Sequence, residues 1–130
     1  MITAAKSLGN LNGALPQARG ENGYNAVKLA EVMGLSLDEL ATILNRHVTG
    51  LRRNPESTKL QGELTDLVTL AHLMITLEGE AYLRWWLRAP IPELRYRTPL
   101  SLLLNADGKT ENPADELLGR LNAVLSGEGQ

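Results

Sequence analysis

The longest helical pattern in the chain is STKLQGELTDLVTLAHLMITLEG, residues 57–79. From Leu60 to Ile75 its apolar residues recur at the three- and four-residue spacing that places them on one face of a helix. Gly79 follows this pattern, and glycine readily adopts the left-handed conformation that ends helices. The sequence therefore predicts a connecting long helix over 57–79 that forms the spine of the fold.

The composition favours a small all-α helical bundle. The 130 residues contain no Cys and no Phe, so the core must come from Leu, Val, Ile, Ala and Met around two Trp and three Tyr. Leu and Ala keep their freedom in helices, and no alternating β-branched run occurs. The absence of Cys excludes disulfides and thiolate metal sites and fits a cytoplasmic location. No apolar run is long enough to cross a bilayer, so no membrane partner is expected.

Upstream of the long helix, the sequence carries the start and stop signals of two shorter helices. Asn25 is a suitable N-cap and Gly34 a suitable left-handed end for the first helix. Ser36 and Glu39 have the spacing of a capping box that opens the second helix. Asn45, which tolerates positive φ, is expected to end it.

Residues 35–55, LSLDELATILNRHVTGLRRNP, have the pattern of a helix-turn-helix. A third, weaker helix over 48–53 would be the recognition helix, and we assign residues 24–56 to this unit. Residues 46–59 carry four basic side chains and one acidic one, a net charge of +3. Gly50 weakens the recognition helix, so a helical hairpin that does not bind DNA stays an alternative. The candidate DNA-binding residues are Arg46, Thr49, Arg52 and Arg53.

Residues 1–23 have no sustained apolar period. They contain Gly9, Gly13, Pro16, Gly20 and Gly23 among scattered polar residues. Such a composition is typical of segments without a packed structure of their own. We therefore predict a flexible N-terminal arm over 1–23.

Residues 80–130 are predicted to form a second helical unit. A short helix over 80–88 is stopped by prolines, after which Thr98-Pro99 and Asn112-Pro113 each place an N-cap residue before a proline at the first helical position. The adjacent Trp85 and Trp86 lie about 100° apart on a helix, so we expect one ring to pack inward and the other to face outward.

The second unit resembles the C-terminal toxin-binding domain of the Xre/MbcA/ParS antitoxin family. The resemblance extends over roughly residues 25 to 127, because 24–56 lies where that family carries its Xre-like helix-turn-helix. The residues that carry it most specifically are Trp86-Leu87, Pro90, Pro92, Leu94 and Thr98-Pro99-Leu100.

The resemblance implies an antitoxin of a type II toxin–antitoxin system. Its partner would be an NAD-consuming RES-type toxin of ADP-ribosyltransferase-like fold, bound in an oligomeric complex, with operator DNA as a further partner for autoregulation. No cofactor is implied. The expected toxin-binding residues are Trp85, Trp86, Arg88, Leu94, Arg97, Pro99, Leu100, Glu128, Gly129 and Gln130.

Two other classes of protein are alternatives to the antitoxin. A helix-turn-helix transcription regulator without a toxin partner is the principal alternative. An enzyme is not expected, because the sequence has no Ser-His-Asp order, no metal-ligand spacing and no glycine-rich phosphate loop. His47 and His72 stand alone and far apart in the sequence, which favours ordinary surface or core roles.

Overall fold

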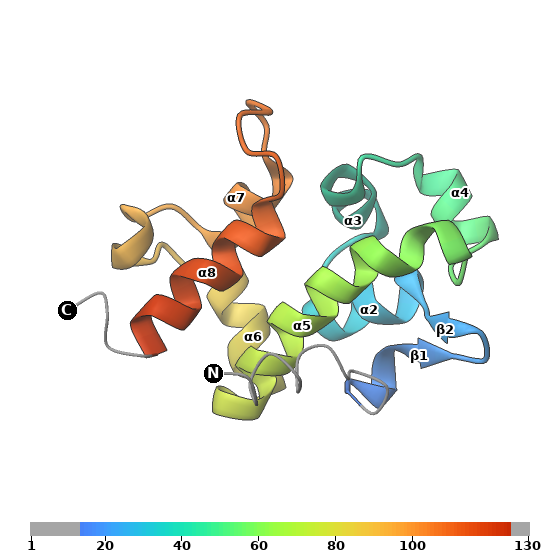
Figure 1. The fold of residues 1–130 in the computed structure, drawn as a ribbon, viewed down its shortest axis with the longest axis horizontal. Coiled ribbons are helices and arrows are strands. Elements are labelled where there is room, and N and C mark those ends of the chain that lie inside the picture. Colours follow the sequence, from blue (N-terminus) through green and yellow to red (C-terminus); the bar gives the residue numbers. More distant parts are fainter. Residues whose placement is uncertain (1–13, 126–130) are drawn as a thin grey trace.

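The structure, a computed structural model, describes residues 14–125, and the side chains as far as Leu121. The predicted all-α class is confirmed: the described residues form seven α-helices and one two-stranded sheet (Figure 1). Helix α5 crosses the middle of the molecule, with α2 to α4 towards one end and α6 to α8 towards the other. The helices are α2 (Ala26–Met33), α3 (Leu37–Leu44), α4 (Val48–Arg53), α5 (Gln61–Glu78), α6 (Glu80–Leu87), α7 (Pro99–Leu104) and α8 (Pro113–Leu125).

The predicted long helix is present with a different start. Residues 58–60 form a 3-10 turn, η2 (Thr58–Leu60), and the α-helix begins at Gln61. Gly79 ends it as predicted, with φ of 98°. Thr69 and Leu70 are buried together with the predicted stripe, because other elements pack on several sides of α5. The buried face of α5 is therefore wider than the single stripe that the spacing indicates.

The predicted caps of the first two helices are confirmed. The Asn25 side chain accepts a hydrogen bond from the backbone N–H of Lys28, and Gly34 ends α2 with φ of 69°. Ser36 and Glu39 form both hydrogen bonds of the capping box, and Asn45 ends α3 with φ of 55°. These local signals alone fix the bounds of α2 and α3.

The two predicted units share one hydrophobic core. A single cluster of buried side chains runs from Leu15 to Leu117 and includes residues of every α-helix from α2 to α8. Helix α6 packs on α2, and α7 packs on α3, so the second unit touches the first directly. The helix-turn-helix region therefore packs against the helices that follow it and buries part of its apolar surface there.

The prediction of a flexible arm over 1–23 is wrong for residues 14–23. They form a 3-10 turn, η1 (Pro16–Ala18), and an antiparallel hairpin of β1 (Arg19–Gly20) and β2 (Gly23–Tyr24). Leu15, Ala18 and Tyr24 are buried in the core. Residues 1–13 lie outside the described residues.

Two distant side chains hold the hairpin. Gln61 accepts from the Tyr24 backbone N–H and donates to the Tyr24 carbonyl, each at 2.9 Å. Glu56 accepts from the Asn25 side-chain amide at 2.8 Å and from the Asn22 backbone N–H at 3.0 Å, and these hydrogen bonds lower the pKa of the Glu56 carboxyl. The Gly and Pro content of residues 1–23, on which the prediction of a flexible arm rests, does not reveal such long-range hydrogen bonds.

The C-terminal helices begin and end near the predicted residues. The Thr98 hydroxyl caps α7, and Asn105 ends that helix with φ of 51°. Asn112 accepts from the Asp115 backbone N–H at the start of α8. None of the helices in the described residues is both long and apolar enough to cross a membrane.

Candidate functional site

The first candidate surface is the outer side of α4, which we call the α4 basic face and define by Thr49, Arg52 and Arg53. Buried Leu51 anchors the helix, and the three-residue turn before it starts at Asn45. All three side chains are exposed. Within the described residues, neither guanidinium forms an ion pair. The α4 basic face is therefore open to an anionic partner.

Helix α4 runs through Gly50 without a break. A Cβ atom at this position would meet nothing within 4 Å. The helix is only six residues long, which is short for a recognition helix.

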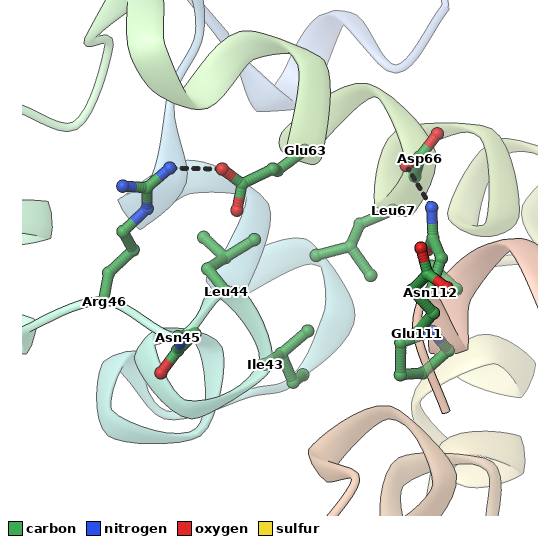
Figure 2. A pocket seen from close by; sticks show the side chains of 11 residues that line it. Ile43, Leu44, Asn45, Arg46, Glu63, Asp66, Leu67, Glu111 and Asn112 are labelled. Atoms are coloured by element: carbon green, nitrogen blue, oxygen red, sulfur yellow. Dashed lines mark hydrogen bonds and ion pairs between the residues drawn. The ribbon is translucent and has the colours of Figure 1, made fainter. Parts of the chain in front are cut away.

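Arg46, an expected DNA-binding residue, is exposed but already has an ion-pair partner within the chain. Its guanidinium forms an ion pair with the Glu63 carboxylate on α5 (Figure 2). The turn brings Arg46 towards α5 rather than towards the α4 basic face, so its charge is already matched inside the molecule.

Arg46 and Glu63 lie at one side of a cleft of about 500 Å³ between the end of α3, the first half of α5 and the start of α8 (Figure 2). At the other side, the Asn112 amide donates to the Asp66 carboxylate at 3.4 Å. The apolar side chains of Ile43, Leu44 and Leu67 lie between these two polar pairs. The Arg46–Glu63 ion pair and the Asn112–Asp66 hydrogen bond therefore connect the turn after α3 and the start of α8 to α5.

The second candidate surface is an apolar groove of about 460 Å³, which we call the Trp85 groove. Its walls come from the end of α5, from α6, from residues 90–94 and from α8. The indole of Trp85 is 58% exposed and stacks at a tilt on Tyr82, with ring centroids 5.3 Å apart. Leu77, also exposed, lies in the same groove. The lining residues are Met74, Leu77, Glu78, Tyr82, Trp85, Trp86, Pro90, Ile91, Pro92, Glu93, Leu94, Leu117, Arg120 and Leu121.

One of the two adjacent tryptophans is buried and the other is exposed, as their spacing on a helix predicts. Trp86 is only 4% exposed and belongs to the core, whereas Trp85 faces outward from the same helix. An exposed Trp beside exposed Leu77 is uncommon on a surface that contacts only water. Among the apolar and aromatic residues that were expected to bind the toxin and that the structure describes, only Trp85 is exposed.

Several other expected toxin-binding residues are not on the surface, which corrects the prediction for them. Their apolar side chains are buried, so they shape the domain and offer little area to a partner, although Trp86 and Leu94 also line the Trp85 groove. The buried residues are Trp86, Leu94, Pro99 and Leu100. Arg97 is exposed, as expected. Glu128, Gly129 and Gln130 lie outside the described residues.

The guanidinium of Arg88 is bound within the chain, although it was expected to bind a toxin. It donates to both Glu39 carboxylate oxygens, at 2.8 and 3.2 Å, and to the Gly34 carbonyl at 2.8 Å. The hydrogen bonds from Arg88 and then from the Ser36 backbone lower the pKa of the Glu39 carboxyl, and the pair raises the pKa of Arg88. Arg88 therefore fastens the end of α6 to α3 and to the end of α2.

Replacing Glu39 by Gln is expected to make stability less dependent on acid pH. Gln keeps the capping-box contact with Ser36 and removes the charge that Arg88 binds. Since folding lowers the pKa of Glu39, its contribution is complete above the carboxyl's unfolded pKa, about 4.3, and is lost as pH falls through the lower folded pKa. Both partners are partly exposed, so Glu39→Gln should lose about 1 kcal/mol or less at pH 7, and about none near pH 3.

Urea denaturation at both pH values measures this difference. Glu21→Gln is the matched control, because Glu21 is an exposed residue in the hairpin turn and forms no ion pair within the described residues. An equal deficit of Glu39→Gln at pH 7 and pH 3 would mean that the charge of Glu39 contributes nothing.

The loop from Ile91 to Arg97 has an unusual backbone. Arg95 and Tyr96 are consecutive and both have positive φ, at 59° and 64°. For L-residues this conformation costs about 1–2 kcal/mol each. Five backbone hydrogen bonds within the loop, including Ile91 N–H to the Arg97 carbonyl at 3.1 Å and Tyr96 N–H to the Ile91 carbonyl at 2.9 Å, hold it in place.

Reasoning from sequence missed two exposed residues, Leu77 and Tyr96, and the half-buried Tyr82, which lines the Trp85 groove. Leu77 lies off the stripe of the long helix, which is a signal that could have found it. Tyr82 lies one turn before Trp85 on α6. Tyr96, 70% exposed between two arginines, could have been noticed as an aromatic residue inside a basic island.

The titratable side chains do not assemble into a recognisable metal site within residues 14–121. No three His, Asp or Glu side chains there gather closely enough to hold a metal ion. His47 is exposed at the start of α4, and His72 is half-buried on α5. Both candidate surfaces are suited to binding: the α4 basic face presents cations, and the Trp85 groove presents an apolar hollow.

Comparison with protein-family models, with curated proteins and with solved structures found no match.

Proposed function

We propose that this chain is the antitoxin of a type II toxin–antitoxin system, which binds and neutralises an NAD-consuming, RES-type toxin. The observation that supports the proposal most is the exposed indole of Trp85 in an apolar groove. Trp and Arg are the residue types that anchor protein interfaces, and Arg120 lies in the same groove. The resemblance of residues 86–100 to the antitoxin family supplies the kind of partner.

The arrangement of the two surfaces supports a protein that binds two partners. The α4 basic face lies at one end of the molecule, and the Trp85 groove is built by helices at the other, with α5 running between them (Figure 1). A toxin in the groove would leave α4 accessible. We therefore propose operator DNA as the second partner, bound through Thr49, Arg52 and Arg53.

A helix-turn-helix regulator without a toxin is the second candidate. The geometry of α3, the turn and α4 favours it as much as it favours an autoregulating antitoxin. A regulator, however, gives no reason for an exposed Trp85 beside exposed Leu77. The antitoxin accounts for both surfaces.

The reading frame beside the gene tests the proposal. Expressed alone, its product should arrest growth and deplete cellular NAD, and co-expression of this chain should restore both. The two proteins should also co-purify. A neighbouring product that is harmless, or whose toxicity this chain leaves unchanged, would contradict the antitoxin and favour the regulator.

The DNA surface is expected to be separable from the toxin surface. Arg52→Ala together with Arg53→Ala removes two unpaired cations, so binding to operator DNA should weaken at least tenfold and depend less steeply on salt, since fewer counterions are released. Neutralisation of the toxin should be unchanged. Gel-shift titrations at fixed salt and growth rescue measure the two functions.

The matched control for the DNA experiment is Arg19→Ala. Arg19 is a partly exposed arginine on β1, outside α4, and its guanidinium stacks over the Tyr24 ring at 4.8 Å. This variant should bind operator DNA like the unaltered chain. Unchanged operator affinity in the double mutant would exclude the α4 basic face as the DNA surface.

A further inference from the structure

The Ile91–Arg97 loop presents Tyr96 between Arg95 and Arg97. Neither core packing nor helix capping accounts for the exposure of this ring. Tyr96 is the most exposed of the large apolar or aromatic side chains in the described residues, at 70%. The loop's only deeply buried side chain is Leu94, which anchors it from below. We propose that this loop is a preformed docking element for an acidic surface of the partner protein, with Tyr96 inserted into a hollow of that surface.

The backbone of the loop supports preformation. Arg95 and Tyr96 both occupy the left-handed region, which residues other than glycine rarely adopt, and the loop's own hydrogen bonds hold them there. A strained conformation that the surrounding structure over-determines is typical of binding sites. Because the loop is already ordered, binding does not have to bear the entropy of ordering it.

The charges of the loop identify the chemistry of the partner. Within the described residues, no carboxylate forms an ion pair with Arg95 or Arg97. The Nε of Arg97 donates to the Leu94 carbonyl at 3.2 Å, which orients its guanidinium without neutralising it. Two arginines that flank Tyr96 in the chain, and that have no carboxylate partner within the described residues, fit carboxylates that surround a hollow of about ring size.

A protein fits this surface better than a nucleic acid does. Ile91 to Leu94 of the same loop line the Trp85 groove, so apolar area continues from Trp85 to the loop. Exposed Glu93 leaves the loop with a net charge of +1, from two arginines and one glutamate, which suits a small acidic patch on a protein better than the continuous charge of a phosphate backbone. The loop is also far from the α4 basic face (Figure 1), so one DNA site could not easily engage both.

This inference rests on the proposed function, because the partner is the toxin that the chain neutralises. It adds the Ile91–Arg97 loop to the Trp85 groove and states the charge of the toxin surface. It also adds Arg95 and Tyr96, which the resemblance did not assign, to the expected contact Arg97.

The experiment measures binding to the product of the toxic neighbouring frame, purified as a non-toxic variant, by calorimetric titration at low and at high salt. Tyr96→Gly removes the ring and relieves the positive φ. It should weaken binding about tenfold or more, while the urea midpoint of the free chain stays the same or rises. Tyr96→Asn also tolerates positive φ and keeps a stiffer backbone than glycine, and it should lose binding as well.

The charge is tested by the double variant Arg95→Asn, Arg97→Gln. Its affinity should fall at low salt and become less dependent on salt. Arg52→Gln with Arg53→Gln removes the same charge from the other end of the molecule and is the matched control, which should bind the toxin normally.

The outcomes separate this inference from the proposed function. If the unaltered chain binds the neighbouring product and the loop variants bind equally well, the inference alone is wrong. If the unaltered chain does not bind it, the proposed function and the inference are both wrong. A lowered urea midpoint of Tyr96→Gly would show a structural role and overturn the inference. The inference would also be overturned if the loop variants lost affinity for operator DNA, or if they dissociated a dimer of the free chain in sedimentation.

Discussion

Trp86→Ala is expected to destabilise the free protein by about 3–5 kcal/mol, the typical cost of removing a large aromatic side chain from a core. Trp86 is 4% exposed and lies in the cluster shared by all the described α-helices. For a domain of this size the loss corresponds to a melting temperature lower by roughly 10–20 °C. Since whole domains are stable by only about 5–15 kcal/mol, much of the variant could be unfolded at 37 °C.

Thermal and urea unfolding of the free chain measure this effect. Trp85→Ala is the matched control, because it removes the same side chain from the neighbouring position on the solvent side of α6. It should change stability by about 1 kcal/mol, mostly through the lost stacking on Tyr82. Equal destabilisation by both variants would contradict the division into one buried and one exposed tryptophan.

Trp85→Ala is expected to have its large effect on the toxin complex. If the Trp85 groove binds the toxin, loss of the indole should weaken binding by about 2 kcal/mol or more, which is roughly 30-fold. Growth rescue should fail at low expression of the variant. The free protein should remain folded, so the loss can be assigned to the interface.

Calorimetric titration against the purified toxin measures the affinity of Trp85→Ala. Trp85→Phe provides the comparison, because a smaller aromatic ring still fills part of the groove and should retain part of the affinity. If Trp85→Ala binds and neutralises the toxin as well as the unaltered chain does, the Trp85 groove is not the toxin surface.

The features that the sequence predicted correctly depend on contacts between residues that lie close together in the chain. The capping box of Ser36 and Glu39 is formed by residues three positions apart, and the left-handed ends at Gly34 and Asn45 depend on the residue type at one position. The outward and inward directions of Trp85 and Trp86 follow from the 100° step of a helix. The all-α class follows from the same short-range patterns.

The tertiary structure decided everything that depends on partners far away in the chain. Residues 14–23 are ordered because Gln61 and Glu56 bind the hairpin from more than 30 positions away. Arg46 is occupied by Glu63, and Arg88 by Glu39, because packing brings α5 and α6 against the helix-turn-helix region. An arginine in a sequence shows its charge but not its counter-ion, and an apolar residue shows its hydrophobicity but not whether another helix covers it. The sequence by itself therefore determined most of the helices and the caps of α2 and α3, and only the packing of the helices decided where α5 begins, that residues 14–23 are ordered, and which charges have a partner.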